Sequence, residues 1–473
     1  MREKFKKLFK DSGLLFISSF SSKILVFLLV PLYTNILSTR EYGIYDLFYS
    51  TIQMITPILT LNIIDSVFRF AIDKNNNKKS IFTIGIKYSL ISIIIVDVLS
   101  LIVGVLNIGG IYGQYLVFFT ILYIVYIIHD FFIQFVRGLD RVKDISLSGI
   151  VSTIVMILSN VLFLIVFKMG LVGYFYAMII SLLVPSGLLF FKNKLWEYID
   201  FREKELELDQ YKKQMIKYSL PLIFISLSWH INSVADRYVV TFISGIEENG
   251  IYSISYKIPA ILNAIQVIFI QAWQISAIKE FKRDEDPVFY NLTYKGCNIL
   301  MTTLCSILIA SSKIIAKVLF AKEFYVAWKY VPILLIYIVF NTLSGTVGAV
   351  FSAAKETKKL AISGVIGALT NIVLNFVLVY EYGAMGAAIA TLISSVVIWM
   401  LRVYYSKKYN ISIDLKKDVY MYVILLIQSI LLINVKSELY SYILQFIILL
   451  FVIVINYLKL KKLKKDIRGI NNE

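Results

Sequence analysis

Cysteine and histidine are almost absent from this sequence of 473 residues, which contains two of each. Cys297 and Cys305 fall on one predicted helix, about 12 Å apart along its axis, which is too far for a disulfide. We therefore predict two core thiols rather than a disulfide. His129 and His230 have no Cys/His cluster around them, so the sequence indicates no metal site.

A nucleotide-binding loop is also missing. The glycine-rich run NIGGIYG at residues 107–113 lacks the Lys-Ser/Thr pair of a phosphate-binding loop and falls in a short predicted outer turn. We therefore expect no ATP hydrolysis and no cofactor, and we expect a protein that is not an enzyme.

Charged residues are scarce, at 17% of the chain, whereas hydrophobic residues make up 58% and the mean hydropathy is +0.76. A soluble surface cannot hide so much apolar side chain, so the excess must face lipid. Apolar stretches of roughly twenty residues recur from end to end, each long enough to cross about 30 Å of hydrocarbon. The sequence predicts an all-α polytopic membrane protein with about fourteen transmembrane helices. The predicted spans are roughly 13–37, 45–68, 80–106, 113–136, 146–168, 171–192, 217–244, 250–276, 290–320, 327–352, 358–379, 384–404, 418–434 and 439–458.

Lysine and arginine exceed the acids and give a net charge of +17. These basic residues gather at the N-terminus, in alternate connections and in the tail after residue 458, whereas the intervening connections hold few. The positive-inside rule then predicts that both termini are cytoplasmic. The positive charge therefore sets the topology of the chain in the lipid bilayer. We expect no binding of nucleic acid.

The two halves of the chain repeat each other. A shift of 207 positions aligns residues 12–24 with 219–231 and residues 41–50 with 248–257, and GxxG occurs at 170–173 and again at 383–386. An even number of spans in each copy makes the copies parallel, so two six-helix bundles should enclose a central cleft. The predicted domains are an N-terminal bundle (1–192), a cytoplasmic linker (193–214), a C-terminal bundle (215–408), and helices 13 and 14 with a basic tail (409–473). The linker is either an amphipathic segment on the membrane surface or a solvated connection.

Charged residues inside the predicted spans must line a cavity or form pairs, because each costs several kcal/mol when it faces lipid. Basic residues outnumber acidic ones in this set, which favours an anionic passenger. The set contains Lys23, Asp65, Arg69, Lys87, Asp97, Asp130, Asp236, Arg237, Lys257, Lys313 and Lys317.

Arg237 is the best single candidate for the cleft. Asp236 and Arg237 point about 100° apart on one helix, so at least one of them needs a partner from elsewhere. Lys23 and its repeat mate His230 are both polar in mid-membrane, although a lone histidine is more often a packing residue. Asp65 and Arg69 are four residues apart and could neutralise each other instead of binding a substrate.

The motifs of this chain resemble those of polysaccharide flippases of the Wzx type, in the multidrug/oligosaccharidyl-lipid/polysaccharide exporter superfamily with its MATE-like fold. The resemblance covers essentially the whole length. It rests on the opening segment 12–47 with its Glu-Tyr-Gly turn, on Arg69-Phe70, and on segment 218–258 with Asp236-Arg237 and Gly250-Ile-Tyr252.

The resemblance implies export of an undecaprenyl-diphosphate-linked oligosaccharide for surface polysaccharides such as O-antigen or capsule. The sugar and the diphosphate would cross a cationic cleft by alternating access, and the polysaccharide synthesis and polymerase proteins would be partners. The expected diphosphate-binding cations are Lys23, Arg69, Arg237 and Lys257. The side chains expected either to pair or to carry a coupling H⁺ or Na⁺ are Asp65, Asp97, Asp130, Asp236 and His230.

Three alternatives stay open at this stage. A flippase for the peptidoglycan lipid precursor would have a similar fold and a similar number of spans. A drug/cation antiporter of the same superfamily would want an acidic cavity and usually twelve spans. A membrane enzyme such as a polysaccharide polymerase would need a long outer loop for its catalytic residues, and the predicted outer connections are short.

Overall fold

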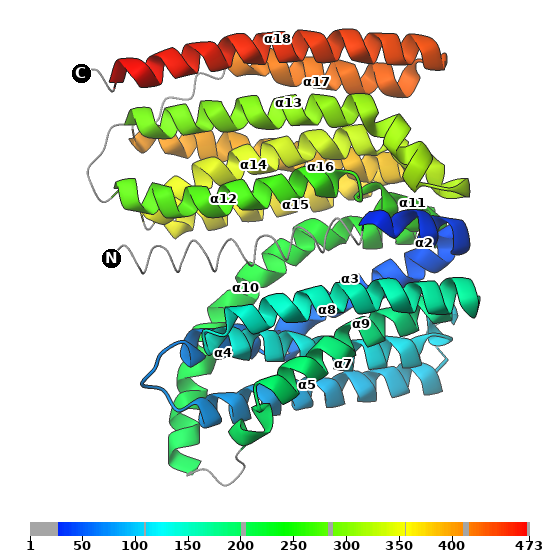
Figure 1. Ribbon diagram of the computed structural model, residues 1–473, viewed down its shortest axis with the longest axis vertical. Coiled ribbons are helices and arrows are strands. Elements are labelled where there is room, and N and C mark those ends of the chain that lie inside the picture. The colour runs from blue at the N-terminus through cyan, green and yellow to red at the C-terminus, as the bar shows by residue number, and fades with distance from the viewer. Residues whose placement is uncertain are drawn as a thin grey trace. The chain divides into compact units, whose positions relative to one another are not determined.

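A computed structural model of the protein describes residues 27–107, 110–199, 205–281, 287–354, 356–409 and 416–470 (Figure 1). All regular elements within these ranges are helices, which confirms the predicted all-α class. Contacts divide the chain into two compact units, residues 1–234 and 235–473, and each is described by itself. The predicted domain boundaries stay a prediction.

Long apolar helices dominate both units. In the described residues, nine helices are long and apolar enough to cross a membrane, or eleven if each of two bent pairs forms one span. The helix at Asp418–Asn434 is apolar but shorter. The chain is therefore a multi-pass membrane protein, while the number fourteen stays a prediction.

The described elements follow one another along the chain with short connections. In the first unit they are α2 (Val30–Ile36), α3 (Thr39–Leu59), α4 (Ile63–Ala71), α5 (Lys78–Val105), α6 (Gly110–Gly113), α7 (Leu116–Gly138), α8 (Val142–Asn160), the π-helix η1 (Val161–Val166), α9 (Gly170–Lys192) and the 3₁₀ turn η2 (Leu195–Tyr198). Helix α10 (Glu205–Ser244) passes from the first unit into the second. In the second unit follow α11 (Ile246–Ser255), α12 (Pro259–Phe281), α13 (Pro287–Leu319), the 3₁₀ turn η3 (Lys322–Lys329), α14 (Val331–Ala353), α15 (Thr357–Tyr382), α16 (Ala384–Ser406), the 3₁₀ turn η4 (Lys407–Tyr409), α17 (Lys416–Asn434) and α18 (Glu438–Ile470).

Two predicted spans are broken in the structure. The span predicted at 45–68 is bent by 66° between α3 and α4, and the span predicted at 250–276 is bent by 52° between α11 and α12. Pro57 removes a helical hydrogen bond just before the first break, where Leu61 and Asn62 adopt a φ of 51°. Pro259 begins α12 and disfavours a helical conformation at the residue before it. Proline chemistry therefore accounts for both bends.

The repeated glycines have the same role in both units. Gly170 and Gly383 precede or begin the last helix of each bundle with a φ of +55°, a conformation that other residues rarely adopt. A Cβ on Gly173 would lie 3.0 Å from the carbonyl oxygen of Phe163, and one on Gly386 only 2.1 Å from that of Leu378. The second glycine of each GxxG thus lets two helices approach closely.

The repeated glutamates lie beside these turns. Glu41 Oε1 is 3.4 Å from the position of a Cβ on Gly170, and Glu248 Oε1 is 3.5 Å from that on Gly383. Glu41 also forms a capping box with Ser38 at the start of α3. The shift of 207 residues that aligns the sequences also aligns the starts of α3 and α11. The repeat therefore preserves a scaffold around the ends of the helices.

The predicted linker 193–214 packs against the first unit. Its Leu195 is buried with Phe82 and Phe135 in a hydrophobic cluster, together with Met215 just beyond the predicted end of the linker. Ser66 of α4 donates a hydrogen bond to the backbone carbonyl of Met215 at 2.9 Å. The described residues of this segment thus bury apolar side chains against protein, which the interpretation as a solvated connection did not anticipate.

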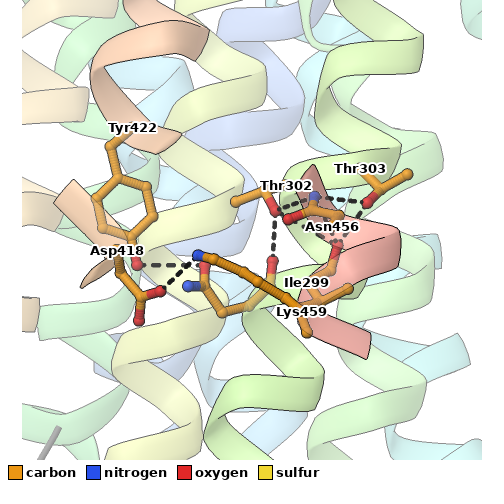
Figure 2. A network of polar contacts seen from close by, with 8 residues as sticks. Ile299, Thr302, Thr303, Asp418, Tyr422, Asn456 and Lys459 are labelled. Carbon is orange, nitrogen blue, oxygen red and sulfur yellow. Dashed lines mark hydrogen bonds and ion pairs between the residues drawn. The ribbon is translucent and has the colours of Figure 1, made fainter. Parts of the chain in front are cut away.

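Helices α17 and α18 are attached to α13 by buried polar contacts (Figure 2). Asn456 of α18 donates to Thr302 Oγ1 at 3.0 Å and to Thr303 Oγ1 at 2.8 Å. Lys459 pairs with Asp418 of α17 at 2.9 Å. Because hydrocarbon offers polar groups no alternative partners, these contacts favour a fixed position of the helix pair on α13. The basic tail predicted after residue 458 is, through Ile470, a continuation of α18.

The two cysteines lie on the same helix, α13. Both Cys297 and Cys305 are buried and neither forms a disulfide. The predicted core thiols are confirmed.

Substitution of Asn456 tests the attachment of α18. We expect Asn456→Leu to lower the free energy of unfolding by about 1–2 kcal/mol, because the hydroxyls of Thr302 and Thr303 lose their amide donor. Thermal unfolding in detergent would measure the change. Asn434→Leu is the control, since Asn434 donates only to the carbonyl of Ile430 in its own helix. Equal effects of the two substitutions would contradict the interhelical role.

A charged cluster joins the start of α15 to η4. Glu356 pairs with Lys359 at 2.7 Å and with Lys408 at 2.5 Å. Hydrogen bonds from Lys359 first, and then from Lys408 and Tyr409, lower the pKa of Glu356 to about 2. Because this pKa is lowered, the stabilisation is present above the ordinary pKa of glutamate and is lost as the pH falls towards 2.

The pH dependence of unfolding tests this cluster. We expect the difference in Tm between wild type and Glu356→Gln to be constant above pH ~5 and to shrink between pH ~4.5 and ~2. Glu381→Gln is the control, because Glu381 forms no ion pair within the described part of the chain. A difference that does not depend on pH would contradict the assignment.

Candidate functional site

The candidate site is built around Asp236, a carboxylate in the C-terminal part of α10. Asp236 is 1% exposed and accepts three hydrogen bonds from neutral donors. Tyr252 of α11 donates at 2.9 Å, Asn375 of α15 donates at 2.6 Å, and the hydroxyl of Thr391 of α16 is also bonded. The prediction that Asp236 or Arg237 needs a partner from elsewhere is confirmed. Four helices meet at this carboxylate.

Two amide oxygens beside Asp236 lack hydrogen-bond donors. The Oδ1 atoms of Asn371 and Asn375 are buried without a partner, although both residues lie in the described part of α15. Buried acceptors without a donor are uncommon, and they call for a water or a cation that is not a side chain. A single carboxylate with neutral oxygens suits a monovalent cation, since hard cations prefer oxygen ligands. In the described residues, no three His, Cys, Asp or Glu side chains gather in a way that could hold a metal ion.

Arg237 lies close to the same network. Its guanidinium carbon is 5.5 Å from the centroid of the Tyr256 ring, and its side chain is half-buried. The hydroxyls of Tyr252 and Tyr256 are 2.9 Å apart, so a chain of contacts leads from Asp236 through two tyrosines to Arg237. The two neighbouring charges therefore contact different sides of one cluster.

Lys257 lies in the break between α11 and α12. Its backbone amide donates to the carbonyl of Ile254 at 3.0 Å, and its side chain is half-buried. A broken helix at membrane depth is typical of sites that bind substrates or ions in transporters. The ring of Tyr256 contacts Arg237, and Lys257 is the next residue in the sequence after Tyr256. Arg237 and Lys257 thus belong to the same region of the second unit.

The remaining predicted residues lie in the first unit. Asp65 and Arg69 are both exposed on α4, and Asp65 accepts a hydrogen bond from Asn62 at 2.9 Å instead of an ion pair with Arg69. Asp130 of α7 is half-buried and close enough to Asp65 for repulsion between the carboxylates. Asp97 of α5 is half-buried, and its Oδ1 has no hydrogen-bond partner among the described residues.

Two predicted residues fall outside what the structure describes. Lys23 precedes the first described residue. His230 belongs to α10, but its side chain is not among those described. Their predicted roles stay predictions.

The cluster around Asp236 has no copy in the first unit. The shift of 207 places Leu29 opposite Asp236. The Ser-Gly pairs at 148–149 and 363–364 give a shift of 215, which places Met156 opposite Asn371, and the GxxG motifs give a shift of 213, which places Met178 opposite Thr391. The exceptions are the two tyrosines, since Tyr45 and Tyr49 correspond to Tyr252 and Tyr256, and Asn375, which corresponds to the buried Asn160. The carboxylate itself has no counterpart. The two units therefore share a scaffold but differ in polar chemistry.

Some residues of the cluster escaped the sequence analysis. Asn371, Asn375 and Thr391 are uncharged, and a search for charges in spans does not find them. The sequence feature that could have indicated Asn371 and Asn375 is their spacing of four residues, which places both on one face of an otherwise apolar helix. Arg402 was also missed, although it lies in the predicted span 384–404; it donates to Ser363 Oγ at 3.1 Å and to the carbonyl of Ser344 at 3.1 Å.

Comparisons place this fold among known transporters. The family described as polysaccharide biosynthesis protein matches residues 8–278. A lipid II flippase MurJ in an inward closed conformation is 16% identical, with 94% of this chain and 98% of that chain covered and a TM-score of 0.68. An inward-facing MATE multidrug resistance transporter of the MOP superfamily is 14% identical, with 82% and 94% covered and a TM-score of 0.63.

A third solved structure has the same fold. It is a MOP superfamily transporter from Pyrococcus furiosus, described by a reverse polarity of its binding pocket, with 15% identity, 84% and 94% covered and a TM-score of 0.58. No curated protein matches the sequence. The resemblance to the exporter superfamily and its MATE-like fold is confirmed.

Removal of one donor tests the network. We expect Thr391→Val to lower the free energy of unfolding by about 1.5–3 kcal/mol, because a buried carboxylate loses one of its hydrogen bonds. Thermal unfolding in detergent is the measurement. Thr370→Val, at an exposed threonine bonded only to the carbonyl of Ile366, is the matched control and should have little effect. Similar losses at both positions would contradict the role of Thr391.

Proposed function

The chain belongs to the polysaccharide biosynthesis protein family, and from this premise we propose that it is a flippase for an undecaprenyl-diphosphate-linked oligosaccharide. The lipid-linked sugar would move from the cytoplasmic to the outer leaflet of a bacterial inner membrane, with both termini of the chain in the cytoplasm. Movement would use alternating access around a cationic central cleft. The product would feed synthesis of a surface polysaccharide, and the enzymes that make and polymerise the repeat would be partners.

The physical problem explains why such a protein is needed. A sugar and a diphosphate lose their hydrogen bonds with water in hydrocarbon, so they need polar partners along the whole path. The polyprenyl tail is as apolar as lipid and can remain in the bilayer. A cleft with arginine and lysine therefore matches the part of the substrate that cannot cross alone.

One observation carries the proposal more than any other. Arg237 and Lys257, two cations within the part of the chain that matches the family, flank the tyrosines at the break between α11 and α12. Arginine binds phosphate groups with paired, charge-assisted hydrogen bonds, which suits a diphosphate. Arg69 in the last turn of α4 and Lys23 on the first predicted span would complete the set from the first unit.

The cluster at Asp236 supports coupling to a cation. The amide oxygens of Asn371 and Asn375 accept no hydrogen bond and could coordinate a metal cation beside the carboxylate. A proton on Asp236 would need no such ligands, so these oxygens favour Na⁺ over a proton as the coupling ion. Each negative charge that leaves an inside-negative cell also gains about 2.3 kcal/mol per 100 mV. Inward movement of a cation and outward movement of the diphosphate would thus both be favourable.

A flippase for a peptidoglycan precursor is the second candidate, because the fold of the lipid II flippase covers 94% of this chain. Both substrates carry the same polyprenyl diphosphate, so the cationic residues do not distinguish them. The two substrates would be distinguished by the sugar on the lipid-linked intermediate that accumulates when the protein is depleted.

Replacement of Arg237 tests the cationic cleft. We expect Arg237→Ala to weaken binding of the diphosphate by about 10- to 100-fold, the equivalent of about 1.5–3 kcal/mol for hydrogen bonds to charged groups. In cells, lipid-linked oligosaccharide should then build up on the cytoplasmic leaflet while surface polysaccharide falls. Complementation of a deletion strain, with quantification of both pools, would measure this.

Two control variants make the result specific. Arg237→Lys should restore part of the export, because a point charge replaces a paired donor. Arg40→Ala removes an exposed arginine of α3 and should leave export unchanged. Normal export by Arg237→Ala would remove this residue from the substrate path.

A further inference from the structure

We propose that Tyr256 is a positioning residue that transmits the occupancy of the Asp236 site to Arg237. This inference rests on the proposed function, and adds to it a route between the cation and the diphosphate. The route consists of two hydroxyls and one aromatic ring. Tyr252 contacts Asp236 at 2.9 Å, Tyr256 contacts Tyr252 at 2.9 Å, and the ring of Tyr256 lies 5.5 Å from the guanidinium carbon of Arg237.

The hydrogen bonds of this chain have a defined direction. A tyrosine hydroxyl has one proton to donate, and the carboxylate of Asp236 can only accept. Tyr252 therefore donates to Asp236, and Tyr256 must donate to the oxygen of Tyr252. In this state the proton of Tyr256 points towards Tyr252, and the electron-rich ring of Tyr256 is available to the guanidinium of Arg237.

A cation at Asp236 changes this arrangement. A bound Na⁺ occupies carboxylate lone pairs and cancels the negative charge, so that Tyr252 gains less by donating to Asp236. Tyr252 can then donate to Tyr256, whose proton must turn away from Tyr252. The reversal weakens the hold of Tyr256 on Arg237, so that the guanidinium is more available to an anion. This change favours binding of a diphosphate by Arg237.

The other groups described around Asp236 on α14, α15 and α16 are uncharged side chains. From α14, Tyr337 interacts electrostatically with Asp236 and with Tyr256. From α15 and α16, the neighbours are the neutral side chains of Asn375 and Thr391. The ring of Tyr256 contacts Arg237, and its hydroxyl contacts Tyr252, so these two tyrosines connect Arg237 with Asp236.

The repeat supplies a matched control. Tyr49 corresponds to Tyr256 and Tyr45 to Tyr252, and their rings are 6.0 Å apart in the first unit. The residue opposite Asp236 is Leu29, so no carboxylate is present at that end of the pair. Tyr49→Phe therefore removes the equivalent hydroxyl without touching a cation site.

The experiment measures how sodium changes the affinity for undecaprenyl diphosphate at constant pH and ionic strength, with choline as the replacement cation. For the full-length wild type in lipid nanodiscs we expect Kd to fall about tenfold with sodium, within the usual range of coupling between two sites. For Tyr256→Phe, which keeps the ring, we expect less than a twofold change. Asp236→Asn should bind independently of sodium, and Tyr49→Phe should behave as wild type.

A second measurement separates the relay from the cation site. Sodium should raise the Tm of Tyr256→Phe as much as that of wild type, because its cation site remains and binding stabilises the folded state. A tenfold response of Kd in Tyr256→Phe would overturn the relay. Loss of its sodium-dependent Tm shift would also overturn it, since Tyr256 would then belong to the cation site. Failure of wild type to bind undecaprenyl diphosphate would instead overturn the proposed function, and the relay with it.

Discussion

A polar group inside a membrane protein must find its partners within the chain, because hydrocarbon supplies none. Buried polar side chains that join neighbouring helices illustrate this constraint. Asn456 fixes α18 to the threonines of α13, and Asp236 gathers donors from three further helices. Because of the same constraint, a buried oxygen without a hydrogen-bond donor indicates that a ligand is needed there. The amide oxygens of Asn371 and Asn375 have no donor and lie beside a buried carboxylate, which is why we propose a cation there.

The duplicated scaffold and the single site serve different purposes. Glu41 and Glu248 lie beside Gly170 and Gly383 in the same way, so the repeat determines how each bundle is held at its helix ends. Asp236, in contrast, has Leu29 as its counterpart. Two similar bundles with one polar cluster would let the cation act on one half of the transporter, which is the asymmetry that a directional cycle needs.

The sequence predicted the all-helical membrane class and the need of Asp236 for a distant partner, because hydropathy and helical periodicity are local properties. It did not predict the partners, since Asn375 and Thr391 follow Asp236 by more than a hundred residues and carry no charge. The bends near Pro57 and Pro259 were missed as well, because each apolar stretch continues through the break. Tertiary contacts decide the partners of Asp236, whereas the prolines decide the bends.

Transbilayer movement of the proposed substrate is the most direct test of the central claim. Purified protein would be reconstituted in vesicles with an undecaprenyl-diphosphate-linked oligosaccharide, and an impermeant glycosidase would report which leaflet holds the sugar. We expect the protein to make the inner pool accessible much faster than in protein-free vesicles, and an inward sodium gradient to increase the rate. No movement of the lipid-linked sugar, together with sodium-driven transport of a cationic drug, would contradict the account and favour an antiporter.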